Sequence, residues 1–185
     1  MKNKFVFALL FSLTAGIAQA GLMDDLNKST SGNLEAKAKE QAREKARAEG
    51  NKKLAAQVNK RLLDEGRKNQ CSFKSGTDKL EPGCGSKSKK LANVIIDVKK
   101  SLQSQGQTGF KFIVSGHTDS SGNAAKNKAL SMRRAQVMIK ELIAQGVSAE
   151  DIEATGMGSS KPIIKKDDTP AKKAKNRRYE VQVRF

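Results

Sequence analysis

The chain has 185 residues, and its 36 lysines and arginines against 19 aspartates and glutamates give a formal net charge of +17. A charge of this size points to anionic partners such as nucleic acid, lipid head groups or acidic polymers. One histidine and two cysteines supply no metal-ligand cluster. The acidic pairs Asp24-Asp25 and Asp167-Asp168 lie in polar segments that we expect to face solvent, so the composition disfavours an acid–base hydrolase.

Residues 1–20 have the pattern of a secretory signal peptide. Lys2 and Lys4 precede an apolar run from Phe5 to Ala18, and small residues up to Ala20 form a cleavage site. The run is shorter than the roughly 20 residues that span a bilayer, so we expect cleavage after Ala20 and no transmembrane segment in the mature chain. A retained signal anchor is the alternative. No cysteine follows the cleavage site, so we expect no lipid anchor.

Export changes the interpretation of the charge. Losing Lys2 and Lys4 leaves +15 on a chain that we expect in the periplasm, associated with the cell wall or outer membrane. An exported protein rarely meets nucleic acid, so we expect it to bind none. Anionic envelope polymers, lipid head groups or an acidic protein face are the expected counterparts.

Residues 21–70 form a charged helical stalk or linker. Strong helix formers dominate from Asn33 to Arg67. Leu54, Val58 and Leu62 recur every four residues and form a narrow apolar stripe at the end of this helix. A solvated stalk is one interpretation. The other is a helix that binds an outer-membrane protein or associates with a second copy of itself.

Residues 71–185 have the length of one domain. Their hydrophobic spacing predicts helices at Ser86–Gln103 and Ala124–Ala144, and strands at Ser72–Thr77, Phe110–Val114, Asp151–Thr155 and Tyr179–Phe185. The alternation predicts an α/β (α+β) two-layer sandwich of βαβαβ type. We expect a mixed sheet with the helices on one face and the other face partly open.

Cys71 and Cys84 are the two cysteines. In an oxidising compartment we expect a disulfide that closes a small loop and stabilises the fold by roughly 3 kcal/mol, with two free thiols as the alternative. No metal is expected, because zinc would need closer spacing or more ligands and His117 is the single histidine.

The candidate site begins at Gly116-His117-Thr118-Asp119, directly after a predicted strand. Arg134 lies on the helix that follows, so a carboxylate and a guanidinium belong to one structural unit. A ligand that carries both an ammonium and a carboxylate could bridge them, and the planar guanidinium suits a carboxylate. This pattern favours a binding site for a zwitterion over a catalytic site.

Several spaced motifs resemble the peptidoglycan-binding domain of the OmpA/MotB family over about Ser72 to Phe185. They are Gly116-His117-Thr118-Asp119, Leu130-Ser131 with Arg134-Ala135, Gly156-Met157-Gly158, and Asn176-Arg177-Arg178-Tyr179-Glu180. The resemblance implies a non-enzymatic domain without cofactors that binds peptidoglycan through the diaminopimelate of its stem peptide. It maps the main ligand contacts to Asp119 and Arg134, with Thr118 as a minor contact.

The resemblance also suggests roles for neighbouring residues. Of Arg177 and Arg178, one is expected to be structural and the other to assist the pocket, and we predict Arg178 as the ligand contact. Asn127 and Ser131 are expected to be structural, and His117 is expected to pack and form hydrogen bonds at the strand end.

This chain departs from the family where Lys172-Lys173 replace a usual Gly-Arg pair, so the resemblance does not predict the conformation of the loop at 167–175. The leading hypothesis is an anchor that tethers an envelope component to the cell wall. The alternative is a basic module that binds envelope polyanions, a porin or another outer-membrane partner without a working pocket.

Overall fold

The computed structural model describes residues 14–74 and 76–185, with side chains from residue 34 onward. Most of the expected signal peptide, residues 1–13, lies outside the described residues. Helix α1 spans Thr14–Lys68. The chain divides into two compact units, one ending at Gly50 and one comprising Asn51–Phe185.

In the first unit, every side chain from residue 34 to residue 50 is exposed, in keeping with a charged helix. The exposed residues include Leu34, which is 65% accessible. Over the part of the chain that the structure covers, each helix is too short or too polar to cross a membrane.

The apolar stripe at the end of α1 packs inside the second unit. Leu62 is completely buried, and Leu54 and Val58 are partly buried against the same core. The domain's own core therefore covers the stripe. The interpretations of the helix as a solvated stalk or as a partner-binding helix stay predictions for its exposed part at 34–50.

The second unit contains the remaining elements. They are α2 (Cys84–Ser104), β1 (Lys111–His117), α3 (Ala124–Ala144), a short 3₁₀ turn η1 (Ala149–Asp151), β2 (Ile152–Gly158), α4 (Pro170–Asn176) and β3 (Tyr179–Arg184). The two predicted helices and the last three predicted strands are confirmed, although β2 continues beyond the predicted end at Thr155 as far as Gly158.

The first predicted strand, Ser72–Thr77, was wrong. The segment makes an isolated bridge between Phe73 and Leu80 instead of joining the sheet. Its backbone hydrogen bonds are made within residues 72–81: Lys74 N–H donates to the Lys79 carbonyl at 2.9 Å, and Glu81 N–H donates to the Ser72 carbonyl at 3.0 Å. The segment is therefore a small folded-back loop beside the sheet.

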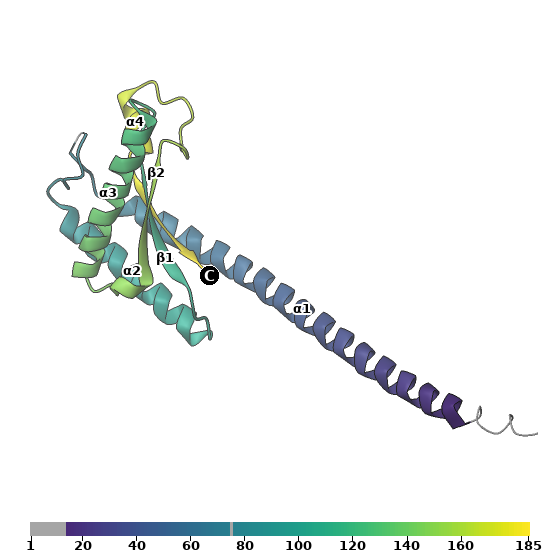
Figure 1. The fold of residues 1–185 in the computed structure, drawn as a ribbon. Coiled ribbons are helices and arrows are strands. Elements are labelled where there is room, and N and C mark those ends of the chain that lie inside the picture. The colour runs from purple at the N-terminus through teal and green to yellow at the C-terminus, as the bar shows by residue number, and fades with distance from the viewer. Residues whose placement is uncertain (1–13, 75) are drawn as a thin grey trace, which may run out of the picture. The chain divides into compact units, whose positions relative to one another are not determined.

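The sheet is mixed, as predicted, with the strand order β2-β1-β3. Strand β1 is parallel to β2 and antiparallel to β3. Phe112 and Val114 are fully buried in the core shared with α2 and α3, whereas Ile113 and Ser115 on the other face of β1 are partly exposed. Figure 1 shows α3 lying along the strands, which gives the predicted two-layer α+β arrangement.

Two glycines bring α3 into direct contact with the sheet. A Cβ atom on Gly116 would lie 2.1 Å from the Ser131 carbonyl oxygen, and one on Gly156 would lie 2.7 Å from that of Lys128. Ser131 fastens the contact, because its hydroxyl accepts from Gly158 N–H and donates to the Lys128 carbonyl, both at 2.8 Å. Its predicted structural role is confirmed, and the contact fixes α3 over the ends of β1 and β2.

The end of α1 and the residues after it cover the open edge of β3. The Asn59 amide accepts from Val183 N–H at 2.6 Å and donates to the Val183 carbonyl at 3.2 Å. The Gln70 amide pairs in the same way with Tyr179. Its oxygen accepts from Tyr179 N–H at 3.1 Å, and its nitrogen donates to the Tyr179 carbonyl at 3.3 Å. The two amides take the place of a neighbouring strand, which protects the edge from pairing with another chain.

Candidate functional site

The turn that carries Asp119 leaves β1 and leads into α3. Asp119 Oδ1 accepts from Ser121 N–H at 3.0 Å, and Asn127 donates its amide to the Ser121 carbonyl at 2.8 Å. The Asn123 side chain caps α3 by accepting two backbone N–H groups. Asn127 therefore has the structural role that the sequence predicted.

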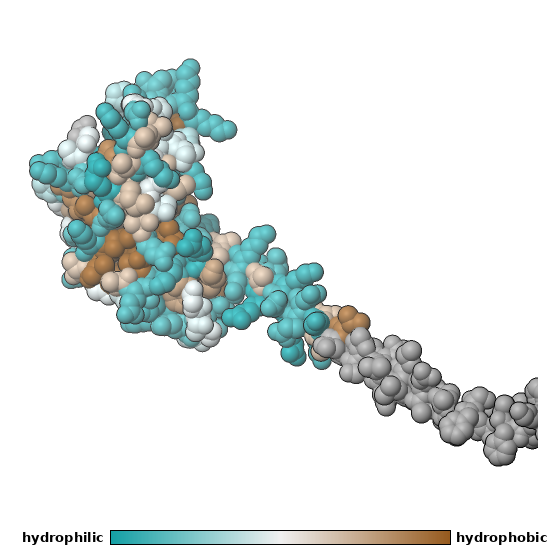
Figure 2. Space-filling model, viewed as in Figure 1, coloured by the Kyte–Doolittle hydropathy of each residue, from teal (hydrophilic) through white to brown (hydrophobic). Residues whose placement is uncertain are grey.

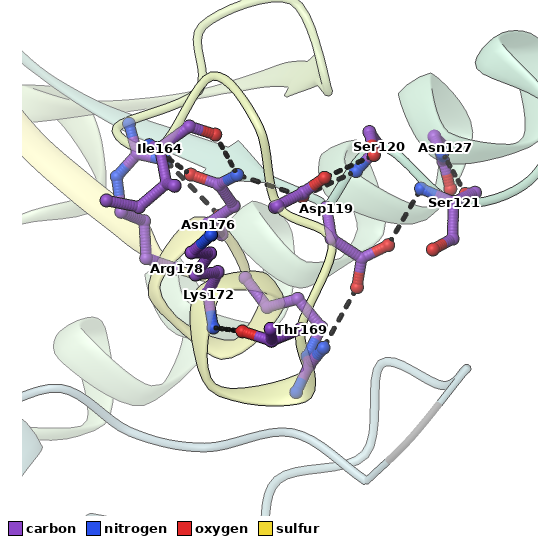
Figure 3. A network of polar contacts seen from close by, with 11 residues as sticks. Asp119, Ser120, Ser121, Asn127, Ile164, Thr169, Lys172, Asn176 and Arg178 are labelled. Carbon is purple, nitrogen blue, oxygen red and sulfur yellow. Dashed lines mark hydrogen bonds and ion pairs between the residues drawn. The ribbon is translucent and has the colours of Figure 1, made fainter.

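A buried carboxylate ties this turn to the loop after β2, as Figure 3 shows. Asp167 is 5% exposed and accepts from the Ser120 N–H at 3.0 Å, from the Ser120 hydroxyl and from the Asn176 amide at 2.9 Å. These bonds lower the pKa of Asp167 to about 2. The prediction that Asp167 faces solvent was wrong, while Asp168 is exposed and pairs with Lys172 at 2.7 Å.

Asn176 orders the rest of that loop. Its oxygen accepts from the backbone N–H groups of Ile163 and Ile164 at 2.9 and 3.0 Å, and its amide donates to the Ile164 carbonyl at 2.9 Å. The Thr169 side chain caps α4. The loop whose conformation the resemblance did not predict is thus a short capped helix held against the Asp119 turn.

Arg134 forms the second part of the site and is 4% exposed on α3. Its Nε donates to the Thr77 carbonyl at 2.9 Å, and its guanidinium carbon lies 5.0 Å from the centre of the Phe73 ring. Burial lowers the pKa of Arg134, with Asp119 and Asp78 acting in the opposite direction. The guanidinium stays charged at neutral pH. Its two terminal nitrogens have no hydrogen-bond partner within the described part of the chain.

Asp119 is paired with Arg177. Arg177 Nη1 lies 2.9 Å from Asp119 Oδ2, with the two side chains 41% and 14% exposed. Burial alone would raise the pKa of Asp119, but hydrogen bonds from Arg177 and Ser121 outweigh it and lower the pKa below its usual value. Asp119 is therefore ionised, and the Arg177 guanidinium already balances its charge.

Arg178, the arginine predicted as a ligand contact, lies elsewhere. Its Nε is 2.7 Å from Glu180 Oε1, and its terminal nitrogens donate to the carbonyls of Asn176 at 3.2 Å and Lys161 at 3.1 Å. The structure brings Arg177, not Arg178, to Asp119. The sequence held a signal for this, because Glu180 lies two residues after Arg178 on the same side of the strand.

Thr118 and His117 are buried beside the turn. Thr118 N–H donates to the Gly158 carbonyl at 2.9 Å, and its hydroxyl has no partner among the residues that the structure describes. His117 packs as predicted, and its backbone N–H donates to the Arg178 carbonyl at 2.8 Å. Its two ring nitrogens have no hydrogen-bond partner among the described residues, and Glu180, 3.9 Å away, is engaged by Arg178. Burial, with Arg178 adding to it, lowers the pKa of His117 to about 4.

The structure contains the predicted disulfide between Cys71 and Cys84. It closes the segment that supplies Phe73 and Thr77 to Arg134. The disulfide thereby holds one wall of the site at the start of α2.

A cavity of about 220 Å³ lies at the opposite end of β1, lined mainly by α2 and the residues between α3 and β2. It includes none of the predicted site residues. Over the described residues, no three metal-binding side chains gather in one place. The charged groups Asp119, Arg134 and Arg177 lie at the other end of β1.

The fold is that of a small α+β domain, with a mixed sheet, helices on one face, and a carboxylate and a guanidinium at one end. The sequence profile of the OmpA family matches residues 72–177, so the chain belongs to the OmpA family. Two relatives are the peptidoglycan-binding protein ArfA of Mycobacterium tuberculosis, 40% identical over 70 residues, and the probable lipoprotein YiaD of Escherichia coli, 34% identical over 113 residues.

These matches are partial. They cover 38% of this chain and 21% of ArfA, and 61% of this chain and 47% of YiaD. The C-terminal domain of Helicobacter pylori MotB superposes with a TM-score of 0.52 at 22% identity, over 63% of this chain and 84% of that one. The peptidoglycan-associated lipoprotein of Burkholderia pseudomallei gives 0.50 at 23%, over 62% and 89%. The structural similarity establishes the shared fold.

Proposed function

We propose that this protein binds peptidoglycan non-covalently through the diaminopimelate of the stem peptide and tethers an envelope component to the cell wall. The observation that carries the proposal is that one end of the domain holds both a buried guanidinium, Arg134, fixed by the Thr77 carbonyl, and an ionised carboxylate, Asp119, whose charge acts on Arg134. The name of the relative ArfA, a peptidoglycan-binding protein, supports the same ligand.

Diaminopimelate in a stem peptide presents one free ammonium and one free carboxylate. The ammonium replaces Arg177 on Asp119, and the terminal nitrogens of Arg134 bind the carboxylate. Arg177, once released, is close enough to Asp119 to serve as a second cation for that carboxylate. Each shielded, charge-assisted bond contributes about 1.5–3 kcal/mol.

Thr118 completes the proposed contacts. Its buried hydroxyl lacks a partner in the described structure, and a buried polar group without a hydrogen bond is costly. A ligand atom or a water molecule held with the ligand would satisfy it. Arg178 instead supports the site by holding the Lys161 and Asn176 carbonyls.

The proposed role is anchoring, without catalysis, in the periplasm. One end of the chain holds the wall, and the helical segment before Gly50 connects it to an outer-membrane protein or a second copy. The stripe at Leu54, Val58 and Leu62 packs internally, so such a partner would meet the charged, exposed part of α1.

A second candidate is a polyanion-binding module without a working pocket, which the net charge of +15 expected after loss of Lys2 and Lys4 favours. Charge-driven binding to a polyanion weakens steeply with added salt, because mobile ions screen exposed charges beyond about 10 Å at 0.1 M. A clamp of partly buried charges is screened less.

Sedimentation with purified diaminopimelate-type sacculi tests the proposal, at low and moderate salt, for the wild type and for Asp119→Ala and Arg134→Ala. We expect salt-tolerant binding that either substitution abolishes. Arg133→Ala serves as a control, because Arg133 is exposed and pairs with Asp78. Salt-labile binding that survives both site substitutions would favour the polyanion module instead.

A further inference from the structure

Several lysines that make none of the proposed ligand contacts lie at the end of the domain that carries the site. We call the proposed ligand contacts Asp119 and Arg134 the clamp. Lys126 and Lys128 lie on the first two turns of α3, Lys161 and Lys165 on the loop after β2, and Lys173 and Lys175 on α4. In the structure as described, none of these six has an acidic partner, whereas Lys166 and Lys172 share Asp168.

These lysines belong to segments that meet around the Asp119 turn. The backbone of Lys128 lies within 3.2 Å of the position of a Cβ atom on Gly158, so the loop after β2 starts beside α3. Asp167 and Asn176 tie that loop and α4 to Ser120. Figure 1 shows α4 at the same end of the domain as the start of α3, and Figure 2 shows a hydrophilic surface there.

The stability of the fold does not explain this placement. The first turns of α3 and α4 contain no acidic residue. Lys126 lies in the first turn of α3, where the positive end of the helix dipole disfavours a cation. Positive charges gathered against a helix N-terminus, beside two site arginines, favour an anionic partner outside the chain.

We propose that these six lysines form a docking surface for the carboxylates of the stem peptides that surround the clamped one in the wall polymer. The inference rests on the proposed function, because a domain that grips one stem peptide through Asp119 and Arg134 must turn this end toward the network. Neighbouring stem peptides carry free carboxylates within the same polymer. A membrane surface cannot occupy this end while the wall does.

The lysine surface speeds the association of the domain with the wall polymer, whereas the clamp recognises one diaminopimelate residue. Exposed lysines raise the local concentration of an anionic polymer and its rate of association, in a salt-dependent way. We expect a short stem peptide to bind through the clamp alone, whereas the polymer also meets these lysines. The quadruple variant Lys126→Gln, Lys128→Gln, Lys165→Gln and Lys175→Gln therefore separates the two effects.

A matched control neutralises four exposed lysines distant from Asp119: Lys52→Gln, Lys53→Gln, Lys100→Gln and Lys140→Gln. Both variants remove the same charge. We expect the first to bind sacculi about tenfold more weakly at low salt, and the control to bind like the wild type. We expect both to bind a soluble diaminopimelate stem peptide with unchanged affinity.

Unchanged sacculus binding by the site-end variant, or equal loss in the control, would overturn the docking surface and leave the clamp standing. Binding to anionic phosphatidylglycerol vesicles is measured for the same variants. If the quadruple variant at the site loses vesicle binding but keeps sacculus binding, the lysine surface would be assigned to a membrane instead. Failure of the proposed function is detected separately. It would be shown by Asp119→Ala binding the soluble peptide as tightly as the wild type does.

Discussion

The two halves of the site are built in different ways. The guanidinium half is a single side chain buried on a helix, with Arg134 fixed by the Thr77 carbonyl and the Phe73 ring. The carboxylate half lies in a turn, where Asp119 is held by loop hydrogen bonds and carries a partly exposed counter-ion, Arg177. In the proposed clamp, the Arg134 half is therefore rigid before the ligand arrives, whereas the Asp119 half must exchange Arg177 for the ammonium of the ligand.

This difference suggests a division of labour. In the proposed clamp, Arg134 binds the ligand with little loss of conformational freedom, because packing has already restricted its rotamers. Asp119 keeps its charge compensated by Arg177 while the site is empty. Specificity for an ammonium next to a carboxylate then requires both halves at once.

The largest effect is expected where the guanidinium half rests on the sheet. Gly116→Ala would drive a Cβ atom into the Ser131 carbonyl, 2.1 Å away, and displace α3 with Arg134. We expect a loss of more than about 4 kcal/mol in the free energy of unfolding, measured by urea denaturation. Gly50→Ala, in a helix with open space around it, should be neutral or stabilising. Equal stability of the two variants would refute the close contact.

The rigid half is tested next by Arg134→Lys. Lysine keeps the charge but loses the Nε bond to Thr77 and the planar fork, so we expect about 2–3 kcal/mol weaker binding of the stem peptide by calorimetry. Arg133→Lys is the matched substitution on the neighbouring exposed residue and should change binding little. If lysine at 134 sufficed, the site would need only a positive charge.

The loop-built half depends on Asn176. Asn176→Ala removes four hydrogen bonds and releases Asp167 from α4, so we expect about 1–3 kcal/mol less stability and weaker peptide binding. The loop no longer supports the Asp119 turn through Ser120. Asp168→Asn, which removes an exposed ion pair on the same loop, should cost at most about 1 kcal/mol. Unchanged peptide affinity in Asn176→Ala would mean that the Asp119 turn is stabilised by its own local hydrogen bonds.

The last effect concerns the pH dependence of stability and His117, which is buried at the end of β1. Its pKa is lowered from 6.5 to about 4 in the folded state, so the unfolded chain binds the proton more readily. Stability should therefore fall as the pH drops from 6.5 toward 4, by at most about 1.4 kcal/mol per pH unit. The slope should be smaller in His117→Asn, followed by urea midpoints across this range. Identical slopes would assign the pH dependence to other groups.

The sequence predicted the helices and the last three strands because their apolar residues recur at clear helical or alternating spacing. It missed the folded-back loop at 72–81, since Ser72–Thr77 has the composition of a strand but makes its hydrogen bonds within itself. The stripe at Leu54, Val58 and Leu62 was visible, but which surface would cover it depends on the tertiary fold.

For the site, the motif placed Asp119 and Arg134 on the correct elements. It did not separate Arg177 from Arg178, because that choice depends on contacts made after folding, of Arg177 with Asp119 and of Arg178 with the Lys161 carbonyl. The burial of Asp167 was also hidden, since its partners Ser120 and Asn176 are 47 and 9 residues away. Long-range hydrogen bonds of this kind leave no local pattern.

Calorimetric titration with two stem peptides tests the central claim most directly. One peptide carries diaminopimelate, and the other carries lysine in its place, which keeps the ammonium and lacks the carboxylate. We expect the wild type to bind the diaminopimelate peptide at least about tenfold more tightly, since one charge-assisted contact is lost with lysine. We also expect Arg134→Ala to remove that preference. Equal affinity of the wild type for both peptides would contradict a two-point clamp.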